Sequence, residues 1–394
     1  MGSCFTNGFV FLPGKGFVHG GFSIEDGHFA EVFTEGAECC LKPAGSDGTA
    51  ESDGEARCID LGGAYVIPGL VDIHTHGAMG ADFSDGDGEG LRRMASHLAK
   101  CGVTSFAPTS MTLPYETLAA AFQTAAEFAE NRPQHCARVM GIHMEGPFFS
   151  EKKKGAQNGA YLKLPDFEAF RRLYEGCGGL VRIADVAPEL PGAAEFAAQA
   201  KELCTVSVAH TDANYDEAKA VFEAGASHLT HLYNAMPPIH HRKPGVIGAA
   251  SECEHVRAEL ICDGLHVHPS SVRMAFRLFP GRICLISDSL RCCGMPDGEY
   301  ELGGQQVFLS GGVARLSDGT IAGAASDLYA DMKNAISFGI PKEEAIEAAT
   351  LRPAREIGRA DEIGSIEAGK LADFAVCDEN LNLSAVYIGG ERVC

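Results

Sequence analysis

Between about residue 65 and residue 355, short apolar runs alternate with longer amphipathic segments, and this alternation constrains the fold most strongly. Runs without a polar face are typical of strands in a parallel sheet that helices cover on both sides. Eight such units predict a (β/α)8 barrel of the TIM type, with an open doubly wound sheet as the alternative. The expected strands are residues 69–74, 104–109, 138–146, 180–189, 205–210, 228–234, 259–264 and 282–289. Helical patterns include residues 90–102, 115–130, 213–225 and 269–279.

Both ends of the chain differ from this middle part, because they consist of short β-rich runs separated by glycines. Residues 43–56 interrupt the first end as a polar loop, and residues 364–393 return to short strands with Gly turns. We therefore expect the two ends to pair in one small β-sandwich domain beside the barrel. The expected boundaries are 1–64 and 356–394 for the small domain and 65–355 for the barrel.

The chain is acidic, with a formal net charge of −21 from 32 Lys and Arg against 53 Asp and Glu. Nucleic acid and anionic membrane surfaces require a basic face, so neither is expected as a partner. A small anion needs only one or two well-placed cations. We expect neither a signal peptide nor a membrane span, since no basic segment precedes an apolar core and no uncharged run is long enough. The 15 cysteines form no C-x-x-C pair, which favours a reducing cytoplasm.

Metal-competent side chains stand where five of the expected strands end. In a barrel of this type, the carboxyl ends of the strands face one shared pocket. Residues i and i+2 of a strand point to the same side, so two of them can reach one ion. Imidazoles and carboxylates are ligands of zinc and other divalent metals, so the set predicts a metal site. Its candidates are His74, His76, His143, Glu145, His210, His228, His231 and Asp288.

Some of these candidates also have a structural interpretation. His210 can be a hydrogen-bonded core residue, and Asp288 can cap a loop. His228 can simply begin its strand, which is the interpretation we prefer for it. Of His143 and Glu145, which share a strand, only one need bind the ion.

Longer motifs are found along nearly the whole chain. They are PGLVDIHTHG, GIHMEGPFF, KKGAQNGAY, VAHTDANYDEA, THLYNAMPPIHHRKPG, ICDGLHVHPSSV, LISDSL, IAGAASDL and GSIEAGKLADFAV. These motifs resemble the amidohydrolase superfamily and, more narrowly, the N-acetylglucosamine-6-phosphate deacetylases. The H-x-H pair marks only the superfamily, whereas THLYNAMP with R-x-P-G and DGLHV is much more specific. The resemblance implies a metal-dependent enzyme that hydrolyses N-acetyl-D-glucosamine 6-phosphate to D-glucosamine 6-phosphate and acetate.

The same resemblance implies roles for the metal-competent residues. Glu145, His210 and His231 match the ligands of the main divalent metal, and Asp288 matches the general base that later acts as general acid. Zinc is the preferred metal, with iron, manganese and cobalt as alternatives. Some members lack the H-x-H pair and hold one metal; this chain has both histidines, His74 and His76, so one or two metals per subunit are expected.

Substrate contacts are implied in the same way. Arg242 and His266 match the residues that hold the sugar phosphate, and the planar guanidinium of Arg242 suits that anion. Its neighbourhood, HHRK, is the most basic part of the sequence, with a solvated loop cation as the alternative. Because the family can draw this clamp from a neighbouring subunit, we expect a homodimer with the phosphate site near the interface. The remaining expected contacts are Ala156, Gln157, Asn234, Ala235, Ile321 and Gly323.

One residue departs from the family pattern. Gln157 stands in KKGAQNGAY, where the family usually has a histidine that helps to polarise the acetyl carbonyl. A glutamine amide donates hydrogen bonds but cannot become a cation. We therefore hypothesise that a second metal at His74 and His76 compensates. The surrounding segment 150–163 is rich in Gly and Lys and is expected to form a lid, with a plain surface loop as the alternative.

Two other classes of function compete with this interpretation. The first is another amidohydrolase that acts on an N-acyl amino sugar or N-acyl amino acid, such as a D-aminoacylase or a dihydroorotase. Several of those enzymes bridge two metals with a carboxylated lysine at a strand end, where this chain has Glu145. The second is a barrel that serves only as a scaffold, but such a protein would have lost ligands or Asp288, and none is missing.

Overall fold

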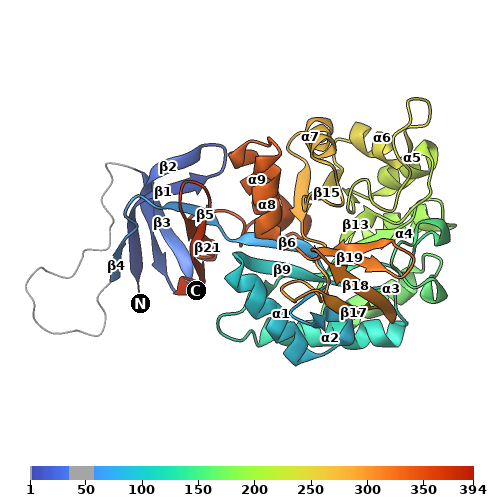
Figure 1. Ribbon diagram of the computed structural model, residues 1–394, viewed down its shortest axis with the longest axis horizontal. Coiled ribbons are helices and arrows are strands. Elements are labelled where there is room, and N and C mark those ends of the chain that lie inside the picture. Colours follow the sequence, from blue (N-terminus) through green and yellow to red (C-terminus); the bar gives the residue numbers. More distant parts are fainter. Residues whose placement is uncertain (1, 35–56) are drawn as a thin grey trace, which may run out of the picture.

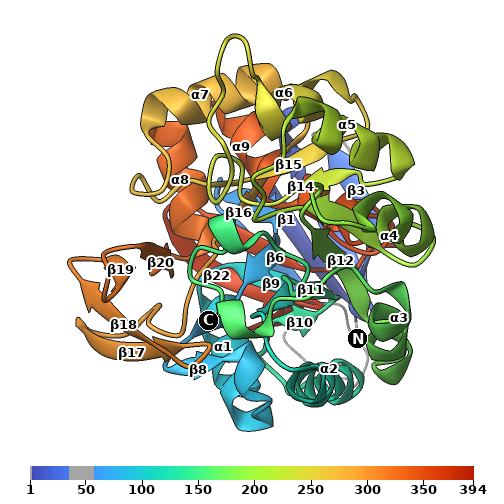
Figure 2. The same cartoon turned by 90° about the vertical axis from the view of Figure 1, so that its right-hand side faces the viewer.

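A parallel sheet curved into a barrel occupies the middle of the chain (Figure 1, Figure 2). The structure is a computed structural model that describes residues 2–34 and 57–394, so the predicted polar loop at 43–56 lies outside the described residues. The barrel strands are β6 (Leu70–Thr75), β9 (Val103–Ser110), β10 (Arg138–Val139), β11 (Ile142–Met144), β12 (Val181–Val186), β13 (Thr205–Val208), β14 (His228–Leu229), β15 (Arg257–Ile261) and β16 (Ile283–Ile286). Both β10 and β11 pair with β9 and share one position, which leaves eight positions around the barrel.

The two ends of this sheet meet just beyond β6 and β16. The backbone N–H of Asp288 donates to the carbonyl of His74 at 2.9 Å, and Thr75 forms a parallel bridge with Ser289. Every residue of β6, β9 and β16 is buried, as expected for strands that are covered on both faces. The predicted TIM-like barrel is thus confirmed, and the open sheet is not what forms.

Amphipathic helices surround the barrel and supply its outer cover (Figure 2). In α1 the buried residues include Leu91, Met94 and Leu98, whose three- and four-residue spacing places them on one face. Asp87 caps this helix by accepting from the N–H groups of Glu89 and Gly90. The helices are α1 (Gly88–Lys100), α2 (Tyr115–Glu130), α3 (Phe167–Gly176), α4 (Ala193–Ala200), α5 (Tyr215–Ala224), α6 (Gly245–Glu252), α7 (Pro269–Leu278), α8 (Leu328–Ser337), α9 (Lys342–Ala349) and α10 (Leu351–Glu356).

Strands from both ends of the chain form a separate mixed sheet, which lies at the left of Figure 1. Its members are β1 (Ser3–Leu12), β2 (Gly16–Glu25), β3 (His28–Thr34), β4 (Arg57–Asp60), β5 (Tyr65–Pro68), β21 (Phe374–Cys377), β22 (Leu383–Ile388) and β23 (Glu391–Arg392). The N-terminal and C-terminal parts join where β5 pairs with β21, which confirms the small β-domain. Aromatic rings fill its core, for example Phe5 and Phe22 with centroids 5.1 Å apart.

A four-stranded antiparallel sheet is inserted between β16 and α8 (Figure 2). Its strands are β17 (Gly298–Leu302), β18 (Gln305–Ser310), β19 (Val313–Leu316) and β20 (Ile321–Ala324). The sequence pattern did not predict a separate sheet for this stretch. Two Gly-Gly pairs, Gly303–Gly304 and Gly311–Gly312, turn its first two hairpins with positive φ angles. Within the described part of the chain, no helix is long and apolar enough to cross a membrane.

Candidate metal centre and catalytic pocket

A cavity of about 320 Å³ opens at the carboxyl ends of the barrel strands. It brings together residues that follow seven of the barrel strands, the segment 150–163 and the inserted sheet. Of the predicted site residues, those lining it are His76, Glu145, Ala156, Gln157, His210, His231, Asn234, Ala235, His266, Asp288, Ile321 and Gly323. The side chain of His74 lies buried next to this set, whereas Arg242 does not line the cavity. Lining residues that the sequence did not single out include Lys152 and Lys153.

One group of candidate ligands consists of Glu145, His210 and His231, which lie just beyond β11, β13 and β14. The Nε2 atoms of His210 and His231 lie 3.0 and 3.2 Å from Oε1 of Glu145, and 3.1 Å from each other. Two ligand atoms at about 2.0–2.1 Å from a tetrahedral zinc ion lie about 3.3 Å apart. The three side chains therefore have the spacing that a shared divalent cation requires.

A second group of candidate ligands is formed by His74, His76 and Asp288. The Oδ1 atom of Asp288 lies 3.5 Å from Nε2 of His74 and 3.3 Å from Nε2 of His76. Glu145 stands between the two groups, because its Oε2 is 3.5 Å from Nε2 of His76 and its Oε1 is 3.6 Å from Nε2 of His74. This arrangement fits two neighbouring cations that share a carboxylate.

The backbone at these strand ends is unusual. His210, His231 and Asp288 have φ angles of 43°, 29° and 51°, in the left-handed region that side chains other than glycine rarely adopt. Such conformations cluster at functional sites, where the surrounding structure holds them in place. They turn the three side chains from the ends of the strands into the cavity.

Hydrogen bonds at the outer ring nitrogens orient the imidazoles. Nδ1 of His76 donates to the carbonyl of Thr109 at 3.1 Å, and Nδ1 of His210 donates to the carbonyl of Lys153 at 2.9 Å. In each case Nε2 is the nitrogen that faces the cavity. Nε2 is thus the atom that each ring can offer to a cation once it has given up any proton, as metal ligands must.

The charges of the pocket stabilise one another. Burial alone would raise the pKa of Glu145, but hydrogen bonds from His210 and His231 hold it well below its usual range. The pKa of Asp288 is likewise lowered, because the neighbouring imidazoles outweigh its burial. Burial opposes the charged form of His231, yet the contact with Glu145 raises its pKa to about 9. A divalent cation that binds here replaces protons, so binding releases them.

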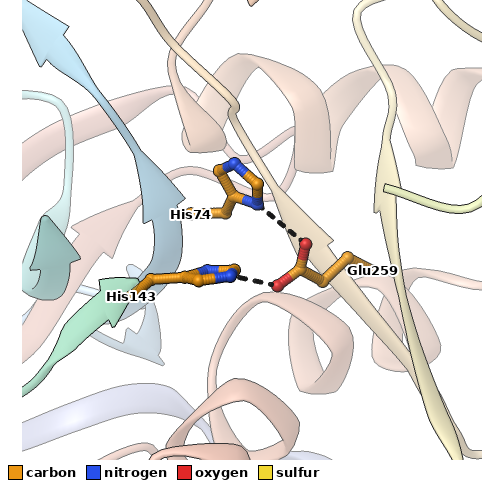
Figure 3. Close-up of side chains that lie close together, drawn as sticks. All are labelled: His74, His143 and Glu259. Atoms are coloured by element: carbon orange, nitrogen blue, oxygen red, sulfur yellow. Dashed lines mark hydrogen bonds and ion pairs between the residues drawn. The ribbon is translucent and has the colours of Figure 1, made fainter. Parts of the chain in front are cut away.

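A third group, His74, His143 and Glu259, lies deeper in the barrel (Figure 3). His143 donates from Nδ1 to the carbonyl of Ile73 and from Nε2 to Asp185, each at 3.0 Å. Since both nitrogens of His143 already donate to acceptors, this histidine has no lone pair for a metal. The group is therefore a hydrogen-bonded network beneath the pocket rather than a cation site. Of His143 on β11 and Glu145 just after it, Glu145 is the one that faces the cavity.

His228 belongs to the same network. It begins β14, and its ring lies between two carboxylates, at 2.9 Å from Glu356 and 3.2 Å from Glu259. Burial opposes its charge, but the two carboxylates raise its pKa to about 10. The sequence did not single out Glu259, although a carboxylate at the head of the apolar run ELIC is a signal that could have identified it.

Gln157 is held by both ends of its amide. Its Oε1 accepts from the backbone N–H of Thr112 at 2.7 Å, and its Nε2 donates to Oε2 of Glu145. The glutamine thus contacts the carboxylate that stands between the two groups of ligands. Arg242, by contrast, is exposed. It lies in a loop that is closed by an antiparallel backbone bridge between His240 and Lys243, and its Nη1 is 2.6 Å from Nε2 of His241.

The family model described as "Amidohydrolase family" matches residues 65–393. The chain belongs to the amidohydrolase family. Within it, this amidohydrolase falls among the N-acetylglucosamine-6-phosphate deacetylases. It is 37% identical to the N-acetylglucosamine-6-phosphate deacetylase of Bacillus subtilis over 364 residues, which cover 91% of this chain and 88% of that protein.

Other relatives of this amidohydrolase differ in the sugar that they are named for. The N-acetylgalactosamine-6-phosphate deacetylase of Escherichia coli O157:H7 is 34% identical over 86% of this chain and 88% of that protein. Among solved structures, a mutant N-acetyl-D-glucosamine-6-phosphate deacetylase of Mycobacterium smegmatis in complex with N-acetyl-D-glucosamine-6-phosphate superposes with a TM-score of 0.87. It is 30% identical, and the match covers 100% of this chain and 99% of that one.

Proposed function

We propose that this protein hydrolyses N-acetyl-D-glucosamine 6-phosphate to D-glucosamine 6-phosphate and acetate. The proposal is carried by one observation: Glu145, His210 and His231 converge within 3.2 Å of one another, beside Asp288, at the mouth of an amidohydrolase barrel. It is further supported by the relatives named for this activity. The galactosamine isomer is the second candidate substrate, because a relative of comparable identity is named for it.

The chemistry of the ligands suits a divalent metal, with zinc preferred over iron, manganese or cobalt. Glu145, His210 and His231 would hold the main cation, and His74 and His76 with Asp288 a second one. A cation bound there supplies Lewis acidity and lowers the pKa of a water molecule toward neutrality. Asp288 then accepts the proton of the attacking water and returns it to the departing amine, which otherwise leaves poorly.

The acetyl group lies beside Gln157 in this proposal. The amide of a glutamine has two N–H donors, and the bond to Glu145 uses one of them. The other can donate to the acetyl oxygen as negative charge develops on it. Gln157, unlike a histidine, stays neutral, and a cation held by His74 and His76 would compensate for the missing positive charge.

The sugar and its phosphate would occupy the outer part of the cavity. Of the residues that line it, Asn234, Ala235, His266, Ala156, Ile321 and Gly323 would contact the substrate. Nδ1 of His266 lies 2.6 Å from Asp263, which orients the ring. We place the protein in the cytoplasm, in amino-sugar catabolism.

Arg242 would reach the phosphate from a neighbouring subunit, which makes the protein a homodimer. This part of the proposal is supported by the position of Arg242, which is exposed and outside the cavity of its own chain. Apolar side chains surround the same loop: Ile239 is 51% exposed and Met274 is 55% exposed, and both line one surface groove. Exposed apolar surface of this kind is typical of an interface.

Steady-state kinetics test the proposed activity. Acetate release is measured with N-acetyl-D-glucosamine 6-phosphate, its galactosamine isomer and the sugar without phosphate. Asp288→Asn should lower kcat by about 10²- to 10⁴-fold, the usual contribution of a general acid or base. The matched control is Asp297→Asn, an exposed loop carboxylate outside the cavity, which should leave kcat unchanged. Preference for the unphosphorylated sugar, or full activity of Asp288→Asn, would contradict the proposal.

A further inference from the structure

Glu259 is a fully buried carboxylate on β15, beneath the pocket. Its Oε2 accepts from Nδ1 of His74 at 2.9 Å and from the backbone N–H of His231 at 3.2 Å. Its Oε1 lies 3.2 Å from Nε2 of His228 and 3.7 Å from Nδ1 of His143. Figure 3 shows the carboxylate between the rings of His74 and His143. One side chain thus contacts a residue from each of the two groups of ligands.

The contact with His74 determines which of its nitrogens is available. Because a carboxylate can only accept, Nδ1 of His74 must carry the proton, and the lone pair is on Nε2. Within the described residues, Nε2 of His74 is buried and has no hydrogen-bond partner. It faces the carboxylates of Glu145 and Asp288 at 3.6 and 3.5 Å. An orphaned buried nitrogen between two anions is well placed to bind a cation.

The rest of the network explains how Glu259 stays charged without a metal. His228 donates to Glu259 and Glu356 at its two nitrogens, which makes it a buried imidazolium between two carboxylates. Arg257 adds a second cation, 3.0 Å from Glu356. The negative charge of Glu259 is therefore balanced by His228 at Oε1, and Oε2 can accept from His74.

We propose that Glu259 is the positioning residue of the second metal site. By holding Nδ1 of His74 as a donor, it keeps Nε2 open toward Glu145 and Asp288 and makes the imidazole a stronger ligand. Metal-binding histidines commonly donate their other N–H to a carboxylate, and loss of that partner weakens metal binding about 10- to 100-fold. The inference rests on the second cation of the proposed function, and it does not depend on which sugar is hydrolysed.

The test measures metal binding directly. Zinc is titrated calorimetrically into metal-free wild type and Glu259→Gln, and bound zinc is counted by elemental analysis after dialysis. In Glu259→Gln we expect the dissociation constant of the second site, formed by His74, His76 and Asp288, to rise by at least about 10-fold. The dissociation constant of the main site should change little. Glutamine has the size of glutamate and can still accept from His231, but it lacks the charge that strengthens His74.

Glu356→Gln is the matched control. It removes a buried carboxylate of the same network, since Glu356 contacts His228 and Arg257 and no candidate ligand. Both variants should lose thermal stability, but only Glu259→Gln should weaken the second site. Equal zinc affinities in Glu259→Gln and wild type, or equal weakening in Glu356→Gln, would overturn the inference.

A zinc-loaded crystal structure of the wild type gives a second test that needs no variant. We expect Nε2 of His74 at ligand distance from the second ion, with Nδ1 still on Glu259. A structure with the ring turned over, or with one zinc per subunit in excess metal, would refute the inference. Neither result would contradict the proposed deacetylation, which is measured separately by acetate release.

Discussion

The two nitrogens of each histidine decide whether it is a candidate ligand or part of the scaffold. His76 and His210 each donate from Nδ1 to a backbone carbonyl and turn Nε2 to the cavity. His143 and His228 donate from both nitrogens, and their rings are fully buried. A sequence shows where an imidazole is, but the hydrogen bond that selects its tautomer comes from a residue distant in the sequence.

At the scale of one residue, the hydrogen bond from Gln157 to Glu145 leads to a prediction. Gln157→Ala removes the donor to Oε2 of Glu145, and a hydrogen bond to a charged group contributes about 1.5–3 kcal/mol. We therefore expect kcat to fall by about 10- to 100-fold, because the carboxylate loses its fixed orientation and the acetyl oxygen loses a donor. Steady-state kinetics and zinc affinity, measured on the same preparation, check this.

Asn158→Ala is the control for that change. Asn158 is the next residue and caps the short turn Gly159–Tyr161, but it does not line the cavity. Its loss should leave kcat near the wild-type value. Wild-type kcat and zinc affinity in Gln157→Ala would mean that the bond to Glu145 has no part in the reaction.

Most of the pocket could be predicted from single residues because its members follow strands. The carboxyl ends of parallel strands meet at one end of the barrel, so His74, His210 and Asp288 are brought together although they are distant in sequence. Strand spacing alone could not decide between His143 and Glu145, since residues two apart share a face of a regular strand, and only the family resemblance pointed to Glu145. β11 ends at Met144, and only Glu145 continues into the cavity.

At the scale of elements, the inserted sheet is what the sequence analysis did not foresee. Its strands are short, antiparallel and only partly buried, so they lack the continuous apolar runs that predicted the barrel strands. The two Gly-Gly pairs were the available signal. β20 nevertheless lines the cavity through Ile321 and Gly323, two residues that only the resemblance had pointed to.

The inserted sheet also contacts the segment 150–163, which leads to a prediction. Nε2 of Gln305 on β18 donates to the carbonyl of Ala156, next to Gln157. Gln305→Ala should therefore loosen this segment, and hydrogen exchange of residues 150–163 should become faster while the melting temperature changes by no more than about 2 °C. Hydrogen–deuterium exchange read by mass spectrometry measures both the segment and the rest of the barrel.

The adjacent residue provides a matched control. Gln306 also lies on β18, but its amide donates to Glu299 within the sheet, on the exposed side. Gln306→Ala should leave exchange in residues 150–163 unchanged. If Gln305→Ala and Gln306→Ala behave alike, the contact does not hold the segment in place.

On the scale of the whole molecule, the predicted phosphate site is divided. Of the two residues predicted to hold the phosphate, His266 lines the cavity of the chain, but Arg242 lies outside it, on an exposed loop next to apolar surface. Local sequence cannot reveal this division, because whether a loop residue faces its own pocket or a neighbour's depends on how two molecules pack. An added cation would suit an anionic substrate in this acidic chain, because of the two lysines that line the cavity, Lys152 and Lys153, the first is already paired with Asp212 at 2.9 Å.

Mixed dimers can show whether Arg242 acts across the interface. Arg242→Ala should raise KM for the phosphorylated sugar, and Asp288→Asn should be nearly inactive, so each homodimer is impaired at low substrate. When equal amounts are dissociated and reassembled, half of the dimers contain one of each chain, and one site of each mixed dimer has both intact residues. Activity should recover to about a quarter of the wild-type value.

Mixing Arg242→Ala with the double variant Arg242→Ala/Asp288→Asn, in which no chain supplies Arg242, should restore nothing. The absence of recovery in the first mixture, with subunit exchange verified by native mass spectrometry, would place Arg242 outside the phosphate site of the partner.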